Sequence, residues 1–115
     1  MDTTTKLQVI LSEKYLEDLK IIFQYGEETF GVQRAELFIK SIEHIVNNLD
    51  SNYFMFPECR FLTTKSKIYR NIILESYLII YRITFTRIEV LRALHTSLCT
   101  SKRIRDIRRV KNLPK

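Results

Sequence analysis

The spacing of apolar residues changes along this chain, and the changes predict the order of its secondary-structure elements. In residues 6–11 apolar and polar residues alternate loosely, as in a short strand. Residues 12–29 begin with a serine suited to cap a helix, and their apolar positions recur every three or four residues. After a natural break at Gly31, residues 35–49 repeat that spacing more regularly. The two stretches predict an antiparallel pair of helices with a short connection.

The second half of the chain has a different pattern, rich in Ile, Leu, Val, Tyr and Phe. Residues 68–75, 77–84 and 88–95 form three runs of strand length, and their short connections favour antiparallel hairpins. Before them, a connection over residues 52–67 contains Phe61-Leu62, a candidate for a short additional strand. The pattern as a whole predicts a two-layer α+β fold: an N-terminal strand, a helical hairpin packed on a mainly antiparallel sheet of four or five strands, and a short basic C-terminal helix.

The length of 115 residues fits one domain over residues 1–115, with a core at about 6–95 and a basic segment at 96–115. The net charge of +6 is distributed unevenly. Residues 1–58 carry five Lys/Arg and ten Asp/Glu, whereas residues 59–115 carry fourteen and three. Such asymmetry indicates an acidic or polyanionic partner for the basic half. The C-terminal segment itself is open to two interpretations, a solvated terminal helix or a docking element for an acidic partner.

Several classes of function find no support in the residues. No apolar run is long enough to span a membrane, and the N-terminus lacks the pattern of a secretory signal. The two cysteines match no metal spacing and are expected to be free thiols, as in a reducing cytoplasm. With only Gly26 and Gly31, the chain has no glycine-rich phosphate loop. We therefore expect a cytoplasmic protein without metal or cofactor.

Each predicted strand carries one arginine in an otherwise apolar row. Arg70, Arg82 and Arg92 occupy these positions, and His95 closes the last strand. Because side chains alternate across a strand, the arginines either extend their charged ends into water or form a cationic patch on one face of the sheet. Such a patch would suit a phosphate or the carboxylates of a partner.

Several short motifs, in order, resemble the RelE/ParE superfamily of bacterial toxins from toxin–antitoxin pairs. Residues 11–25, L-S-E-K-Y-L-E-D-L-K-I-I-F-Q-Y, are similar to the opening of the family's first helix, and Phe30-Gly31 leads into a similar second helix. Arg70, the run Tyr77 to Arg82, and residues 88–95, I-E-V-L-R-A-L-H, resemble the family's strands. Two features depart from the pattern: Thr96 to Cys99 follow the histidine, and the basic tail is longer than a compact toxin needs.

The resemblance implies a toxin that binds a cognate antitoxin, and we expect the two to form a hetero-oligomer. The basic residues of the second half favour an acidic and partly disordered antitoxin segment as the contact. ParE-like members inhibit DNA gyrase and catalyse no reaction, whereas RelE-like members enter the ribosome and cut mRNA. The regular helical hairpin and the strand endings look more like the ParE branch. Gyrase inhibition is therefore the expected function, and a ribosome-dependent endoribonuclease is the alternative.

A nuclease would need an acid, a base and a cation at the phosphate. Arg70 could hold the phosphate and His95 could transfer a proton, with Tyr81 and Glu58 as helpers. The competing interpretation, which we favour, is that these residues support the fold or contact a partner. The sequence thus leans against an enzyme.

Binding is the stronger hypothesis on physical grounds. The residues expected to contact the antitoxin or the target are all cationic: Arg70, Arg82, Arg92, Lys65, Lys67, Arg103 and Arg105. Their charge would attract an acidic segment that orders on binding. A basic nucleic-acid-binding module without toxicity is a further alternative, although no recognisable helix-turn-helix or ribonucleoprotein motif is present.

Overall fold

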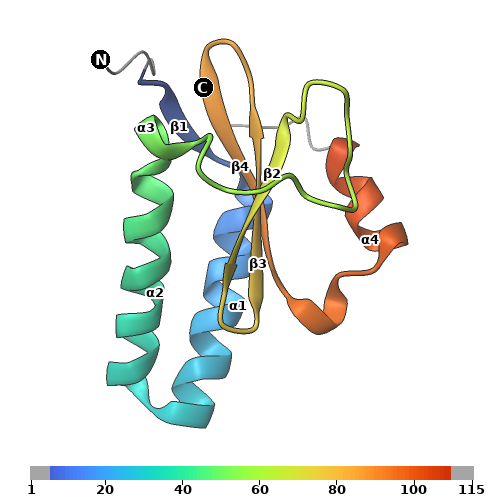
Figure 1. The fold of residues 1–115 in the computed structure, drawn as a ribbon. Helices are drawn as coiled ribbons and strands as arrows, with labels where there is room; N and C mark the ends of the chain where they lie inside the picture. Colours follow the sequence, from blue (N-terminus) through green and yellow to red (C-terminus); the bar gives the residue numbers. More distant parts are fainter. Residues whose placement is uncertain (1–5, 110–115) are drawn as a thin grey trace.

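Two long helices form an antiparallel hairpin. The computed structural model describes residues 6–109 and places α1 at Glu13–Phe30 and α2 at Val32–Asn47 (Figure 1). The Ser12 hydroxyl caps α1 by accepting a backbone N–H of the first turn at 3.0 Å. Gly31 separates the helices with a φ of 93°, a value that residues with a Cβ rarely adopt. The predicted hairpin is confirmed, and no helix in the described part of the chain is long and apolar enough to cross a membrane.

Within residues 6–109, four strands form one mixed sheet beside the hairpin. They are β1 (Gln8–Leu11), β2 (Tyr69–Leu74), β3 (Tyr77–Ile83) and β4 (Arg87–His95). Their spatial order is β1-β4-β3-β2, with β1 parallel to β4 and the other neighbours antiparallel. The tight turn between β2 and β3 holds Glu75 at a φ of 54°, as two-residue hairpin turns require. The predicted α+β fold with a mainly antiparallel sheet is confirmed.

A β-bulge in β4 changes which side chains face the helices. Ile80 pairs with Arg92, but the next residue, Tyr81, pairs with Val90, so Leu91 has no partner across the strands. The alternation expected along the predicted strand at residues 88–95 places Arg92 and Val90 on the same face. That prediction is wrong, because the extra residue shifts the alternation. Val90 lies in the core beneath the hairpin, whereas Arg92 pairs with Ile80, which is buried on the other face of the sheet.

The sheet has a hydrophobic core on each face. The first lies against the hairpin and includes buried residues of both helices and of β2, β3 and β4. The second lies between the sheet and two short C-terminal helices, α4 (Ser101–Arg105) and η2 (Asp106–Arg109). Figure 1 shows the hairpin and α4 on opposite sides of the sheet. The C-terminal helices therefore add a small third layer.

These C-terminal helices are packed rather than solvated. Ile104 and Ile107 are 0% and 2% exposed and contact the second core, which includes Leu62 and Leu91. The Thr100 hydroxyl caps α4 by accepting a backbone N–H at 3.2 Å. The interpretation as a fully solvated helix is wrong, because the two isoleucines pack on an apolar sheet face, and only the charged side of α4 is exposed. The rest of the predicted tail, beyond residue 109, lies outside the described residues.

The connection between α2 and β2 contains a short helix and lacks the additional strand. The polar stretch at its start, whose Asn, Asp and Ser residues favour a turn, contains a one-turn helix, α3 (Leu49–Asn52). Phe61 and Leu62 form no strand but a turn. The Cys59 N–H donates to the Tyr69 carbonyl at 2.9 Å, and the Leu62 N–H then donates back to the Cys59 carbonyl at 3.0 Å. The chain therefore turns away from β2 before a strand can extend.

Candidate functional site

The register of the sheet separates the three strand arginines. Arg70 lies across from Tyr81, which belongs to the core beneath the hairpin. Arg82 and Arg92 lie across from residues of the second core, on the opposite face. The prediction of a single cationic sheet face is therefore wrong. Each arginine has its own internal environment.

Arg92 is paired with Asp18 of α1 at an open edge of β4. The strand β1 pairs with β4 only as far as Val90, and α1 contacts the strand beyond that point. The Asp18 carboxylate accepts hydrogen bonds from Arg92 Nε at 2.7 Å and Nη2 at 3.0 Å, and from the Ala93 N–H at 2.9 Å. The hydrogen bond to Asp18 raises the pKa of Arg92. Asp18 thus takes the place of a neighbouring strand as an acceptor.

Arg82 shares a buried carboxylate with its neighbour Arg87. Arg82 Nε lies 2.6 Å from one oxygen of Glu89, and Arg87 Nε lies 2.8 Å from the other. Burial alone would lower the pKa of Arg82, but its hydrogen bonds with Tyr69 and Glu89 outweigh burial and raise it. Two cations around one buried carboxylate join β3 to β4. Arg82 therefore has a clear role in the sheet itself.

Arg70 fastens the connection that precedes β2. Its Nη1 donates to the carbonyl oxygens of Phe54 at 3.2 Å and Phe56 at 2.9 Å, and its Nε donates to that of Lys67 at 3.2 Å. Glu58 faces Arg70 in an isolated bridge, and its carboxylate accepts a backbone N–H of the same loop at 3.1 Å. The guanidinium of Arg70 is thus occupied by the protein's own carbonyl groups.

The four residues considered for RNA cleavage lie in two places. Glu58, Arg70 and Tyr81 form a row across the sheet. His95 instead pairs with Tyr77, four residues from Tyr81 along β3, which is about 13 Å at the usual rise of a strand. The Tyr81 hydroxyl is buried and donates to a backbone carbonyl at 2.7 Å, and burial raises its pKa. Tyr81 is therefore poorly suited to proton transfer near neutral pH.

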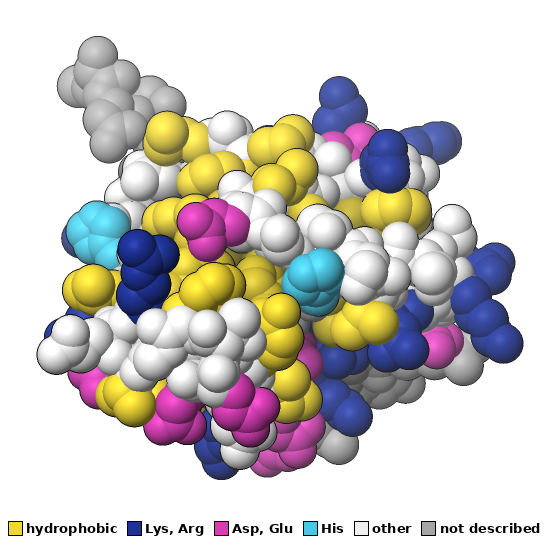
Figure 2. Space-filling view, turned by 90° about the horizontal axis from the view of Figure 1, so that it is seen from below, with side chains coloured by type: hydrophobic (Ala, Val, Ile, Leu, Met, Phe, Trp, Pro, Cys, Tyr) yellow, Lys and Arg dark blue, Asp and Glu magenta, His cyan; other side chains and the backbone are white. Residues whose placement is uncertain are grey.

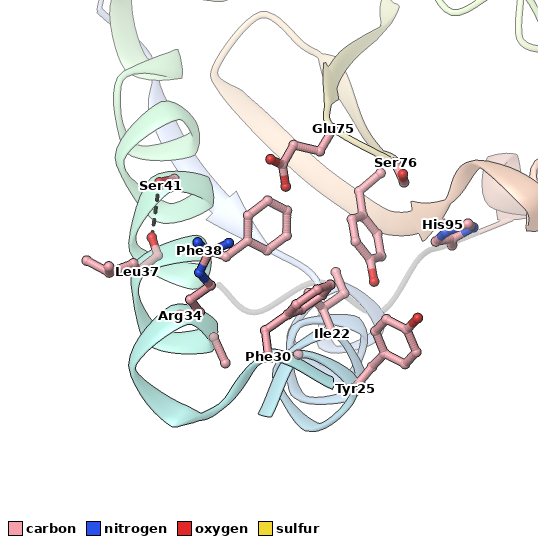
Figure 3. A pocket seen from close by; sticks show the side chains of 13 residues that line it. Ile22, Tyr25, Phe30, Arg34, Leu37, Phe38, Ser41, Glu75, Ser76 and His95 are labelled. Carbon is pink, nitrogen blue, oxygen red and sulfur yellow. Dashed lines mark hydrogen bonds between the residues drawn. The ribbon is translucent and has the colours of Figure 1, made fainter. Parts of the chain in front are cut away.

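His95 lines a cleft of about 590 Å³ between the hairpin and the β2–β3 turn (Figure 3). Its ring meets the ring of Tyr77 edge to face, with 5.3 Å between centroids. The Ser97 N–H donates to His95 Nδ1 at 3.2 Å. This hydrogen bond places the proton of the neutral ring on Nε2. The Ser97 hydroxyl lies 2.8 Å from the same Nδ1 and helps to fix the ring.

The cleft is walled by exposed apolar side chains of both helices. Tyr25, Phe30 and Leu37 line it although they are 56%, 62% and 66% exposed. Arg34 and Glu75 add one charge of each sign. Figure 2 views the molecule from this end and shows hydrophobic side chains gathered around a hollow. Contiguous exposed apolar surface of this kind marks an interaction site.

The sequence reasoning missed this cleft. Leu37 lies outside the stripe of α2 that contains Ala35 and Ile42, and an apolar residue on the polar side of a helix is the available signal. Asp18 was missed for the converse reason, since it is a carboxylate in the buried stripe of α1. Both residues contradict the pattern of their own helix.

The remaining predicted binding residues lie outside the cleft. Lys65 and Lys67 belong to the loop before β2, and Arg103 and Arg105 to α4. All four are exposed, and none forms an ion pair with a carboxylate in the described part of the chain. Within residues 6–109, no group of His, Cys, Asp and Glu is arranged to hold a metal ion.

Comparison with known families identifies the fold. The model of the ParE toxin of the type II toxin–antitoxin system parDE matches residues 9–97. The chain belongs to the ParE toxin family. A chain in a solved structure of the chromosomal ParDE TA system from P. aeruginosa shares the fold, with a TM-score of 0.66 and 18% sequence identity over 78% of this chain and 96% of that one. No curated protein sequence matches significantly.

The ParE match covers the hairpin, the sheet and the cleft. It ends at residue 97, before α4 begins at Ser101. Membership makes this chain a toxin of the type II class and implies a cognate antitoxin as its partner. The end of the match divides the molecule into two parts, a ParE-like body and a C-terminal addition that covers the second face of the sheet.

Proposed function

We propose that this ParE-family toxin acts by binding and inhibiting DNA gyrase, without catalysing a reaction. The observation that carries the proposal is the separation of the candidate catalytic residues. His95 stands about 13 Å along the sheet from the row of Glu58, Arg70 and Tyr81. The cleft, by contrast, offers a preformed and largely apolar binding surface. This combination supports a toxin that binds its target.

The antitoxin is proposed to fill the cleft with a partly disordered segment that orders on binding. The exposed Tyr25, Phe30 and Leu37 would receive its apolar side chains, and Arg34 would face one of its carboxylates. Burial of these exposed side chains supplies the driving force for ordering the segment. Such a segment would carry apolar residues at regular intervals among acidic ones.

The net charge of +6 is proposed to steer the acidic antitoxin toward the toxin. Raising the salt concentration should then weaken the complex mainly by slowing association, which stopped-flow measurements can resolve from dissociation. An association rate that does not change with salt would contradict steering.

The first test is gyrase supercoiling with the purified chain, with and without its antitoxin. Inhibition that the antitoxin reverses is the expected result. If supercoiling is unaffected at concentrations where the antitoxin still binds, the gyrase proposal is wrong and ribosome-dependent mRNA cleavage becomes the hypothesis. His95→Ala and Arg70→Ala would then test catalysis, because a nuclease should lose cleavage in either variant while binding the antitoxin.

A pair of helix variants tests the cleft. Leu37→Glu places a carboxylate at the wall of the cleft, and we expect antitoxin affinity to fall by at least about tenfold. Ile21→Glu is the matched control, since Ile21 is 64% exposed against 66% for Leu37 but does not line the cleft. Calorimetric titration compares the two. Equal loss in both variants, or no loss in either, would exclude the cleft as the antitoxin site.

A further inference from the structure

The C-terminal addition, α4 and η2, has its apolar residues buried against the sheet and its cations exposed to solvent. Ile104 and Ile107 are buried in the second core. The residues between and beside them include Lys102, Arg103 and Arg105, all of them exposed. Exposed cations spaced along a short helix, over a buried apolar side, give this addition one dry face and one basic face.

A neighbouring loop continues the basic face. The Arg108 Nη2 donates to the Thr63 carbonyl at 3.1 Å, which ties the addition to residues 60–67. Figure 1 shows this loop beside α4. The two segments together form a surface that we call the basic surface: Arg60, Lys65, Lys67, Lys102, Arg103, Arg105 and Arg108. Asp106 is the one acidic residue in residues 59–67 and 99–108, and no cation of the surface pairs with a carboxylate among the described residues.

The composition of the basic surface argues against a protein partner. Protein interfaces have an apolar centre that is poor in charge. The large exposed hydrophobic side chains of this protein lie elsewhere, and residues 59–67 and 99–108 contribute none in the described chain. Clustered Lys and Arg without apolar anchors instead suit a phosphate backbone. The one aromatic ring in these two segments, Phe61, is only partly exposed, and the Arg60 guanidinium lies over it at 4.9 Å from the ring centroid, which leaves little room for a single-stranded base to stack.

The rest of the molecule fixes the orientation of such a contact. Exposed acidic residues line the hairpin: Glu13, Glu17, Glu27, Glu28, Glu36 and Glu43. Figure 2 shows Lys and Arg side chains gathered on the side of α4, and Asp and Glu along another edge. A polyanion would be repelled by the hairpin and drawn to the opposite side. The cleft would therefore stay open when the basic surface is occupied.

We propose that the basic surface binds duplex DNA through its phosphates, without reading the base sequence. This activity goes beyond the proposed inhibition of gyrase and does not depend on it. Four cations of the basic surface belong to the C-terminal addition, outside the ParE family match, and Arg60, Lys65 and Lys67 lie inside it. DNA binding would therefore combine this addition with a loop of the ParE-like body. It would hold the toxin on DNA while the cleft side remains free for a protein.

Fluorescence anisotropy with a labelled DNA duplex of arbitrary sequence tests the proposal on the full-length chain. Affinity should fall steeply from about 50 to about 200 mM salt, with a slope near −0.9 for each phosphate contacted. The triple variant Lys102→Gln, Arg103→Gln, Arg105→Gln should flatten the slope by about 3 and weaken binding more than about tenfold at low salt. An unchanged slope would overturn the proposal.

A second triple variant controls for net charge. Lys14→Gln, Lys20→Gln, Lys40→Gln removes the same charge from exposed positions of the hairpin and should leave the DNA slope nearly unchanged. If both variants lose affinity equally, binding follows total charge and no basic surface exists. If the Lys102 triple loses antitoxin affinity but keeps DNA affinity, the surface serves a protein. Preference for single-stranded RNA would also refute the assignment.

Supercoiling assays keep the two proposals distinguishable. The wild-type chain can bind DNA without inhibiting gyrase, in which case the proposed function fails and the DNA-binding surface stands. Conversely, inhibition of gyrase by a chain that does not bind free DNA would refute the basic surface alone.

Discussion

The contact between Asp18 and Arg92 should be among the most costly in the molecule to break. Asp18→Ala would leave the Arg92 guanidinium without its carboxylate and the Ala93 N–H without an acceptor. Losing one partner of a buried pair costs about 3–5 kcal/mol. The side chains of Arg92 and Asp18 are 21% and 7% exposed, so water can partly solvate the orphaned guanidinium. We therefore expect a loss near the lower end, about 3 kcal/mol of unfolding free energy.

Two further variants separate the charge from the hydrogen bond to the strand edge. Asp18→Asn keeps one oxygen that can accept the Ala93 N–H, so it should cost less than Asp18→Ala. The double variant Asp18→Leu, Arg92→Met removes both charges but still leaves that N–H buried without an acceptor, at about 1–3 kcal/mol. The double variant should therefore be more stable than Asp18→Ala alone, which would show that the orphaned arginine carries most of the penalty.

Urea unfolding, followed by circular dichroism, measures these differences as shifts of the midpoint at constant slope. Lys6→Ala is the control, because Lys6 and Asp50 form an exposed pair at 3.6 Å, a class worth about 0–1 kcal/mol. The reasoning is refuted if Asp18→Ala destabilises the protein no more than Lys6→Ala. A changed slope would instead indicate a change in the unfolded or folded ensemble.

Three further predictions follow from buried side chains. Ile104→Ala should cost about 2–5 kcal/mol, whereas Lys102→Ala in the same helix should leave the urea midpoint nearly unchanged. Burial raises the pKa of Tyr15 and Tyr81 above 10.0, so the folded state holds these protons more tightly than the unfolded state does. The stability from this effect should be fully present below about pH 10 and should fall as the pH rises further, by up to about 1.4 kcal/mol per tyrosine per pH unit. A series of urea unfolding curves at alkaline pH with a constant midpoint up to about pH 11 would contradict this. The Cys59 thiol is buried with a raised pKa, so it should react with a thiol reagent only at the rate of unfolding, and rapid labelling in the native state would show that the second core opens.

The parts of the fold that follow a regular period were predictable. The stripe through Ile42 and Val46 predicted α2 because each of its positions is buried by the same sheet face. The β-branched runs predicted β2, β3 and β4 with boundaries within one or two residues. Which residues of β4 face the hairpin was not predictable, because the bulge at Leu91 adds one residue and the hydrophobic period of the sequence gives no sign of it.

The site depended on long-range partners, and sequence spacing does not reveal these. Arg82 and Arg92 occupy similar positions in the apolar rows of their strands. Arg82 nevertheless donates a hydrogen bond to Glu89 on the neighbouring strand, whereas Arg92 donates to Asp18 of α1. Arg70 meets neither and binds backbone carbonyls. Which carboxylate an arginine finds depends on register and on the path of α1 along the edge of β4. The cleft was hidden for a similar reason, because its walls come from elements distant in sequence.

The location of the carboxylates also explains why the molecule has two kinds of cation. Within the ParE match, Arg82 and Arg92 each have a buried carboxylate, Glu89 and Asp18, and their charge serves the fold. The C-terminal addition has no buried carboxylate in its described part, because its inward positions are isoleucines that cover an apolar sheet face. Its cations therefore have no internal partner to neutralise them. The same amphipathic pattern in α4 thus has two effects. Its isoleucines cover an apolar face of the sheet, and its cations contribute to the basic surface on the side of the toxin opposite the hairpin.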